Sequence, residues 1–162
     1  MAEAVDYFLK ITDIKGESKD EKHPDEIQIS SFSYGVTNTG SMGAGGGGGS
    51  GKAAFNDVHC VAQSSIASPL LLLSCANGTH HSEATLVARK SGGDKLEYLK
   101  VTLKDVLVSS YQTGGSGGDV IPMDQFALNF TSIKIDYLPQ DAKGKGGGAT
   151  TAGWDLKKNN KL

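Results

Sequence analysis

The sequence is short of cysteine, of basic charge and of long apolar runs, and each shortage excludes a class of protein. Its two cysteines, Cys60 and Cys75, lie far apart without a Cys-x-x-Cys pair, so they build neither a disulfide framework nor a zinc ribbon. A net charge of −2 provides no basic face for nucleic acid. No stretch approaches the roughly 20 apolar residues of a membrane span. We therefore expect no nucleic-acid partner and no membrane insertion.

A secretory signal is also missing from the first ten residues. They include acidic side chains and no long apolar run, whereas a Sec-type signal needs a basic start and an apolar centre. We expect the chain to fold in the cytoplasm and any export to use another route. Cys75 lies in an apolar segment that is typical of a free thiol, although the sequence leaves the redox state of both cysteines open.

Glycine is the residue in excess, with 22 copies in the chain. Most of them lie in three stretches, 40–52, 114–118 and 144–153, which we interpret as flexible loops. The remainder has an ordinary globular composition, and a chain of 162 residues is long enough for one domain with a sizeable core. The sequence therefore predicts a single domain over 1–162 with three glycine-rich loops.

Strands dominate the predicted secondary structure. Segments rich in Val, Ile, Thr, Tyr and Phe are 5–12, 26–36, 57–63, 83–90, 96–111 and 120–138. One helix is predicted, with Ser68 as its N-cap, Pro69 in its first turn and Asn77-Gly78 at its end. Its apolar residues occur nearly all round, so we expect the sheets or a neighbouring subunit to cover it.

Several predicted strands change their apolar face midway. In 96–111 the apolar residues move from odd positions, such as Leu103, to even positions, such as Val106. Because side chains alternate between faces, either a bulge bends the strand or one segment has both faces covered, for example by a partner. The expected bulges lie near Ser30–Ser31, Lys104–Asp105 and Thr131–Ser132. Bent strands predict an all-β, mainly antiparallel barrel or two-sheet structure with one flanking α-helix.

The catalytic motifs that the sequence approaches are all incomplete. The stretch 46–53 resembles a phosphate-binding loop, but Ala53 stands where Ser or Thr must hold magnesium, and a strand follows. The stretch 114–118 fits a nucleophile elbow, yet no histidine follows His81. The adjacent pairs His59-Cys60 and His80-His81 point to opposite faces of a strand and cannot easily share a metal ion. We predict no enzyme, no catalytic or metal site and no cofactor.

A series of short elements in order carries a resemblance to a known family. The elements are 7–11, 14–18, 25–27, 32–35, 46–52, Ser68-Pro69-Leu70 with Cys75, Gly78 with His80, Arg89-Lys90, 97–99, 105–110, 128–130, Tyr137-x-Pro139-Gln140-Asp141, and 153–155 with Lys158-Asn159. In these elements nearly the whole chain resembles the hemolysin-coregulated protein (Hcp) family, the tube proteins of bacterial type VI secretion. Two positions depart from the family pattern. Ser65 stands where an acidic residue is common, and Asp124 where glutamate is usual.

The resemblance implies a structural role rather than an activity. It implies hexameric rings that stack head to tail, a contractile sheath that propels the tube, a spike protein at its tip and effectors carried in the lumen. It also implies assembly in the bacterial cytoplasm and release without a Sec signal. The rival from another class is a carbohydrate-binding β-sandwich, for which the single Trp154 does not supply the usual cluster of exposed aromatics. A hydrolase is a distant third.

Two sets of residues are candidates for the functional surfaces. Beyond the expected bulge, Phe32 and Tyr34 take the apolar face, which turns Ser31 and Ser33 to the other side. Those serines suit a lumen lined by small polar groups, although they could equally face outside solvent or pack at a sheet seam. The candidate ring-stacking loop is formed by Gly40, Gly45, Gly46, Gly47, Gly48, Gly49 and Gly51.

Overall fold

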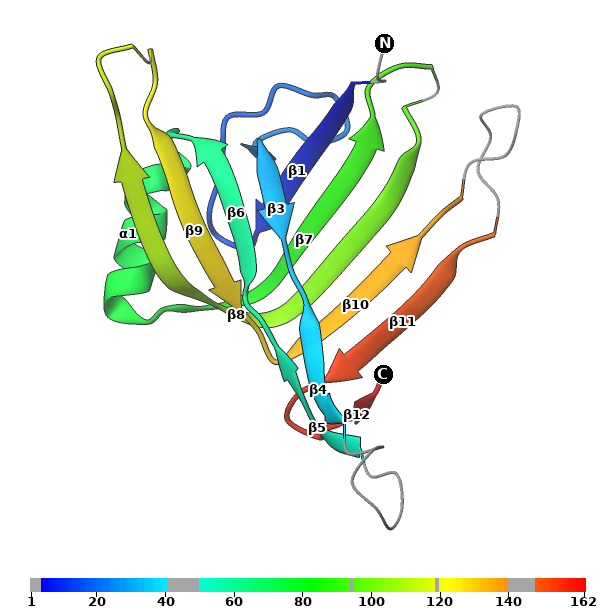
Figure 1. The fold of residues 1–162 in the computed structure, drawn as a ribbon. Coiled ribbons are helices and arrows are strands. Elements are labelled where there is room, and N and C mark those ends of the chain that lie inside the picture. Colours follow the sequence, from blue (N-terminus) through cyan, green and yellow to red (C-terminus); the bar gives the residue numbers. More distant parts are fainter. Residues whose placement is uncertain (1–3, 41–49, 94, 119, 140–147) are drawn as a thin grey trace.

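The computed structural model describes residues 4–40, 50–93, 95–118, 120–139 and 148–162. Within these residues the fold is all-β with a single helix, which confirms the predicted class (Figure 1). The strands are β1 (Val5–Ile11), β2 (Ile27–Ile29), β3 (Ser31–Ser33), β4 (Val36–Gly40), β5 (Ser50–Phe55), β6 (Val58–Gln63), β7 (His80–Lys90), β8 (Glu97–Gly114), β9 (Met123–Asn129), β10 (Ser132–Tyr137), β11 (Thr150–Asp155) and β12 (Asn160–Lys161). The helix α1 spans Ala67–Asn77.

One bent antiparallel sheet contains most of the strands. It runs in the order β12-β11-β10-β8-β7-β1-β2, and from β8 it also continues through β9 and β6 to β3. The long strand β8 belongs to both halves, because its first part pairs with β7 and β10 and its last part with β9. Among the described strands, β2 pairs only with β1 and β3 only with β6, so the sheet does not close into a barrel. Strands β4 and β5 form a separate hairpin that projects from one end (Figure 1).

The predicted change of apolar face in β8 is confirmed. Leu103 and Val106 are both buried, although they differ by an odd number of positions. The cause is Asp105, whose φ of 52° lies in the left-handed region and turns the chain between them. The pairing of β8 with β7 keeps its register across this point, so the expected bulge at Lys104–Asp105 is a left-handed residue rather than an inserted one. The other two changes of face coincide with the breaks between β2 and β3 and between β9 and β10.

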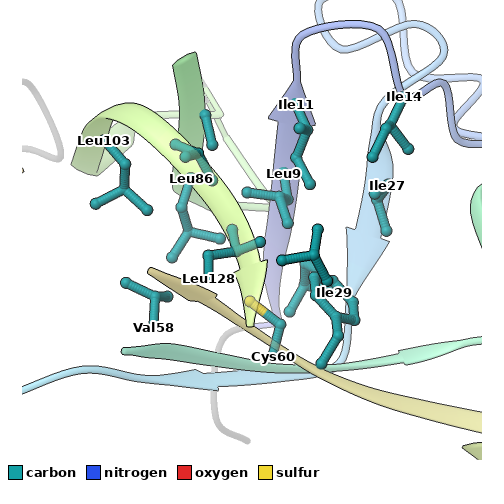
Figure 2. Packing of buried hydrophobic residues seen from close by; sticks show 14 of the residues in the cluster. Leu9, Ile11, Ile14, Ile27, Ile29, Val58, Cys60, Leu86, Leu103 and Leu128 are labelled. Carbon is teal, nitrogen blue, oxygen red and sulfur yellow. The ribbon is translucent and has the colours of Figure 1, made fainter. Parts of the chain in front are cut away.

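The core lies between the two halves of the bent sheet. Figure 2 shows side chains from β1, β2, β6 and β9 pointing toward one another, among them Leu9, Ile29, Val58 and Leu128. Each of these four is at most 5% exposed. Full burial of such a side chain contributes roughly 1.5–3 kcal/mol, so these contacts hold the two halves together.

The segment between β1 and β2 covers the outer side of β1 and β7. Gly16 lies against the backbone of Glu26, where an added Cβ would be 2.4 Å from the Glu26 carbonyl oxygen. Arg89 is buried and its guanidinium donates to Asp20 at 2.7 and 2.9 Å and to Asp6 at 3.2 Å. The same guanidinium lies 4.8 Å from the centre of the Phe8 ring. Charge and packing together therefore fix this segment to the sheet.

Helix α1 differs from its prediction at the start and on its surface. It begins at Ala67 rather than after Ser68, and the Ser65 hydroxyl accepts a hydrogen bond from the Ala67 N–H at 3.1 Å. It ends as predicted, with Gly78 in the left-handed conformation. The described sheets cover only one side of the helix. Leu71 is buried, whereas Leu73 remains 54% exposed.

The strands that sequence reasoning missed are β4, β5, β11 and β12. Part of the glycine stretch 144–153 that we expected to be a loop belongs to β11, where Gly153 pairs with Lys134. An added Cβ at Gly153 would lie 2.9 Å from the Ile133 carbonyl oxygen, so a close approach of strands requires glycine there.

Among the described residues, no helix is long and apolar enough to cross a membrane.

Candidate functional site: an uncharged sheet face

The outer face of β3, β6, β9 and the last part of β8 is built from short or uncharged side chains. The strand register aligns them in rows that cross all or most of these strands. The rows are Ser31–Val61–Gln125–Gln112, Ser33–His59–Ala127–Ser110 and Gln63–Met123–Gly114. We call these residues the uncharged face, because they include no Asp, Glu, Lys or Arg. The Asp57 carboxylate, just before β6, accepts hydrogen bonds from Ser109 at 2.6 Å and Asn129 at 2.8 Å.

The outer face of the other half of the sheet has the opposite character. There the register of β7, β8 and β10 brings together Glu83 with Lys104, and Lys100 with Asp136. The Lys104 ammonium lies 3.2 Å from the Glu83 carboxylate, and both side chains are well exposed. Charged side chains are therefore concentrated on one of the two outer faces. The outer face of β7, β8 and β10 is charged and suits bulk solvent, whereas the uncharged face is neutral.

The predicted pair Ser31 and Ser33 lies on the uncharged face, and both serines are exposed. The neighbouring aromatics point the other way, as predicted. Phe32 and Tyr34 are half-buried against the core and stack with ring centres 6.2 Å apart. Burial raises the pKa of the Tyr34 hydroxyl, so this group stays neutral over the ordinary pH range.

The predicted loop glycines are described only at its two ends. Gly40 ends β4 and pairs with Ser50, and the β4–β5 register shifts between Asn38 and Gly40. Gly51 packs closely on Thr39, where an added Cβ would be 3.0 Å from the Thr39 carbonyl oxygen. Gly45, Gly46, Gly47, Gly48 and Gly49 lie outside the described residues.

A buried carboxylate joins α1 to the core side of the same strands. Asp124 on β9 is 2% exposed and accepts hydrogen bonds from Ser64 at 2.7 Å, from Tyr111 at 3.1 Å and from Ser68. Burial alone would raise the pKa of Asp124, but hydrogen bonds from Ser68, Ser64 and other hydroxyls outweigh it and hold this pKa below its ordinary value. The cluster therefore contains an ionised carboxylate that holds the first turn of α1 against β8 and β9.

Serine, histidine and cysteine often act in catalysis, but in this structure the buried ones have structural roles. The Ser74 hydroxyl lies 3.0 Å from Nε2 of His81, whose Nδ1 lies 2.8 Å from the Thr12 carbonyl oxygen. Both side chains are buried and the third partner is a backbone carbonyl. These hydrogen bonds therefore connect α1 with the end of β1 and do not form a nucleophile with its base. Burial raises the pKa of the Cys60 thiol to about 12. The described part of the chain holds no cluster of three metal-ligating side chains.

Sequence reasoning found two serines of the uncharged face and missed most of the others. Gln112 and Gln125 lie on the consecutive strands β8 and β9, whereas His59 comes from β6, far from both in the chain, and only the strand order brings it beside them. The signal was partial, because Val61 interrupts the alternation of polar residues in β6, and Met123 and Ala127 interrupt it in β9. What the sequence did not reveal was which strands are neighbours.

Known proteins share both the sequence and this fold. The family model described as "Type VI secretion system effector, Hcp" matches residues 8–137. Protein hcp1 of Pseudomonas aeruginosa is 46% identical over 158 residues, which cover 96% of this chain and 98% of that protein. A solved type six secretion system protein aligns with a TM-score of 0.93 at 31% identity, over 98% of this chain and 100% of the other. The crystal structure of Hcp1 from Salmonella typhimurium gives a TM-score of 0.83 at 36% identity, over 98% and 99%.

The fold defines an all-β protein with a single helix among the described residues. The chain belongs to the Hcp family of type VI secretion proteins, which is a family of structural tube proteins and not of enzymes. This agrees with the resemblance and with the expectation that the chain is not an enzyme.

Proposed function

We propose that the chain, as one domain over 1–162, is the structural subunit of the inner tube of a type VI secretion system. Six copies form a ring, and the rings stack head to tail. The observation that carries this proposal is the uncharged face, in which neutral and mostly exposed side chains follow the register of four neighbouring strands. A wall with this composition suits a water-filled lumen that must release what it carries, because it offers no fixed charge to hold a passenger.

The edges of the uncharged face support ring closure. At one edge, β3 has β6 as its only partner among the described strands. At the other edge, the described partner of β8 beyond Leu107 is β9 alone. Two different edges on opposite sides of one sheet suit a head-to-tail contact, which closes into a ring or continues as a filament. Repetition of this contact would place every copy of the uncharged face on the inside.

Ser33 provides the test of the lumen assignment. Ser33→Gln adds bulk to the face at every subunit, and as a surface change it should alter the free energy of unfolding by no more than about 0.5 kcal/mol. We expect intact rings that retain less effector in co-purification. The control is Thr102→Gln on β8, which places the same side chain on the charged face and should leave retention unchanged. Unchanged effector retention by Ser33→Gln rings would remove Ser33 from the cargo surface.

The hairpin of β4 and β5 is the proposed stacking element. It projects away from the rest of the fold (Figure 1), and Gly40 and Gly51 lie at the ends of the stretch that connects its strands. Shortening this stretch should leave the mass of the ring unchanged and impair the growth of tubes. If tubes grow equally well with the stretch trimmed, its role is only connective.

The remaining partners follow from membership of the tube family. We propose a contractile sheath around the tube, a spike protein at its tip and effectors inside, with assembly in the bacterial cytoplasm and release without a Sec signal. Bacteria that express the whole system should release the chain into the medium. Inactivation of the sheath should abolish this release without lowering the amount of chain in the cell. Release that persists without the sheath would contradict the proposal.

A further inference from the structure

A small notch lies where the uncharged face ends at the β4–β5 hairpin. Its volume is about 300 Å³, and it is lined by Ser33, Tyr34, Asn56, Asp57 and His59. The two short links between the sheet and the hairpin contribute to it, 34–35 between β3 and β4 and 56–57 between β5 and β6 (Figure 1). The Asn56 N–H donates to the Gly35 carbonyl oxygen at 2.9 Å and joins these links. We call this space the hairpin notch.

The hairpin notch contains one carboxylate, and hydrogen bonds fix its orientation. Oδ2 of Asp57 accepts from the Ser109 hydroxyl at 2.6 Å, and Oδ1 accepts from the Asn129 amide at 2.8 Å. Both donors are neutral, so they do not cancel its negative charge. Each carboxylate oxygen can accept a further hydrogen bond. Asp57 is half-buried and its neighbours Asn56 and His59 are exposed, so another donor can reach this carboxylate from solvent.

The chemistry of the hairpin notch suits a cation. Its lining, as the structure describes it, includes no Lys or Arg. The Asn56 amide oxygen and the Ser33 hydroxyl are acceptors beside the Asp57 carboxylate. Lys and Arg side chains carry several donors and no acceptor, and their hydrogen bonds to a carboxylate are stronger than those between neutral groups. A basic side chain therefore matches the hairpin notch, whereas an acidic one is repelled.

We propose that the hairpin notch binds a Lys or Arg side chain of the passenger, and that Asp57 selects passengers with a basic surface. This inference rests on the proposed tube function and names the chemistry of what the tube carries. The notch lies at the hairpin end of the uncharged face, so the ring places six copies around one end of the lumen. Asp57 is then the specificity-determining residue of a wall that is otherwise uncharged.

The strength of this contact suits a passenger that must be released. An exposed ion pair contributes little by itself, so one basic side chain does not hold a passenger. A passenger with several basic side chains reaches more than one of the six notches, and its contacts then reinforce one another. Beyond the notches the uncharged face offers no further Asp or Glu. Retention therefore depends on many weak contacts that are lost one at a time.

A short basic peptide tests the hairpin notch directly. The probe is a fluorescently labelled hexa-arginine peptide, titrated into purified rings at low salt and measured by fluorescence anisotropy. Asp57→Asn removes the charge and keeps one acceptor oxygen. We expect its Kd for the peptide to rise about fivefold or more, since one or two exposed ion pairs per peptide are lost. This difference from wild type should disappear at about 1 M salt. A hexa-glutamate peptide should not bind to the wild-type notch.

Asp136→Asn on β10 is the matched control. Asp136 is half-buried and accepts a hydrogen bond from the Thr151 hydroxyl, as Asp57 does from Ser109, but it lies on the charged face. The substitution removes the same charge from every subunit and should leave the Kd for hexa-arginine close to that of wild type. Light scattering and thermal unfolding show whether each variant is folded and assembled.

A variant that strengthens the site keeps the test valid if Asp57→Asn fails to assemble. Asn56→Asp adds a second carboxylate to the hairpin notch and leaves Asp57 with both of its donors. Its rings should bind hexa-arginine more tightly than wild-type rings. Gln28→Glu is the control, because it adds the same charge on β2, outside the notch and the uncharged face. It should not increase the affinity.

The outcomes separate this inference from the proposed function. Intact rings whose affinity for hexa-arginine is the same in wild type and Asp57→Asn overturn the inference and leave the tube function standing. Intact wild-type rings that do not bind the peptide at low salt have the same consequence. An equal gain from Asn56→Asp and Gln28→Glu would show general attraction between charges and would also overturn it. A wild-type chain that is monomeric overturns both.

Discussion

Asp124→Ala is expected to loosen α1 from the sheet and to lower stability substantially. The carboxylate accepts hydrogen bonds from Ser64, Ser68 and Tyr111, and each bond to a charged acceptor contributes roughly 1.5–3 kcal/mol. These contributions overlap because the donors share one carboxylate, so we expect a loss of about 2–4 kcal/mol in the free energy of unfolding. For a domain of this size each kcal/mol lowers Tm by about 2–4 °C. The expected change is therefore roughly 4–16 °C.

Thermal unfolding at pH 7, with ring mass measured on the same samples, is the assay. Asp124→Asn is the shape-matched control, since it keeps one acceptor oxygen and loses the charge, and it should fall between alanine and wild type. Because the pKa of folded Asp124 lies below its ordinary value, the charge stabilises the fold above that ordinary pKa. The additional stability of wild type over Asp124→Asn should disappear as the pH falls through the pKa that Asp124 has in the folded chain. An Asp124→Ala chain whose Tm lies within about 2 °C of wild type would refute the reasoning.

Three further predictions concern the segment that covers β1 and β7. Arg89→Lys keeps the charge but loses the forked contact with Asp20, so chemical denaturation should show a free energy of unfolding that is lower by about 1–3 kcal/mol. An unchanged denaturation midpoint would mean that a positive charge alone is enough to hold the segment. Gly16→Ala forces a Cβ against the Glu26 backbone and should lower the free energy of unfolding by about 1–3 kcal/mol in the same assay. Gly92→Ala is the control, because no atom lies within 4 Å of its added Cβ. Acid should destabilise the chain below about pH 4, because the hydrogen bond from Arg89 is the main cause that holds the pKa of Asp20 below its ordinary value. In Arg89→Lys this acid sensitivity should shrink, and a pH–stability curve identical to that of wild type would contradict the assignment.

The fold class could be predicted because apolar periodicity reports burial directly. The change of face between Leu103 and Val106 was readable from the sequence, since both side chains had to reach the same core. Its cause was not readable. A left-handed Asp105 and an inserted residue produce the same shift of apolar positions, and only the pairing with β7 distinguishes them.

The elements that escaped prediction carry little apolar pattern. In β11, only small and polar residues precede Gly153. This glycine is present because strands approach closely there and not because glycine favours strands. The start of α1 was misplaced because Ser68 has the composition of an N-cap but uses its hydroxyl to donate to Asp124, in a contact between residues 56 positions apart. Tertiary contacts of this kind override local preference.

The uncharged face was predictable only in part for a related reason. Ser31 and Ser33 could be assigned to the face opposite Phe32 from alternation alone. Their alignment with His59, Gln125 and Gln112 depends on a strand order in which β3, β6, β9 and β8 are neighbours. Local sequence does not determine that order, because the β3–β6 and β6–β9 pairings join distant segments, and only β8 and β9 are consecutive in the chain.

The mass of the purified particle, measured by multi-angle light scattering at micromolar chain concentration, tests the central claim most directly. The account predicts a closed ring with a mass about six times the chain mass of 16.9 kDa, unchanged on moderate dilution. A stable monomer under the same conditions would contradict the tube function and the ring contact together.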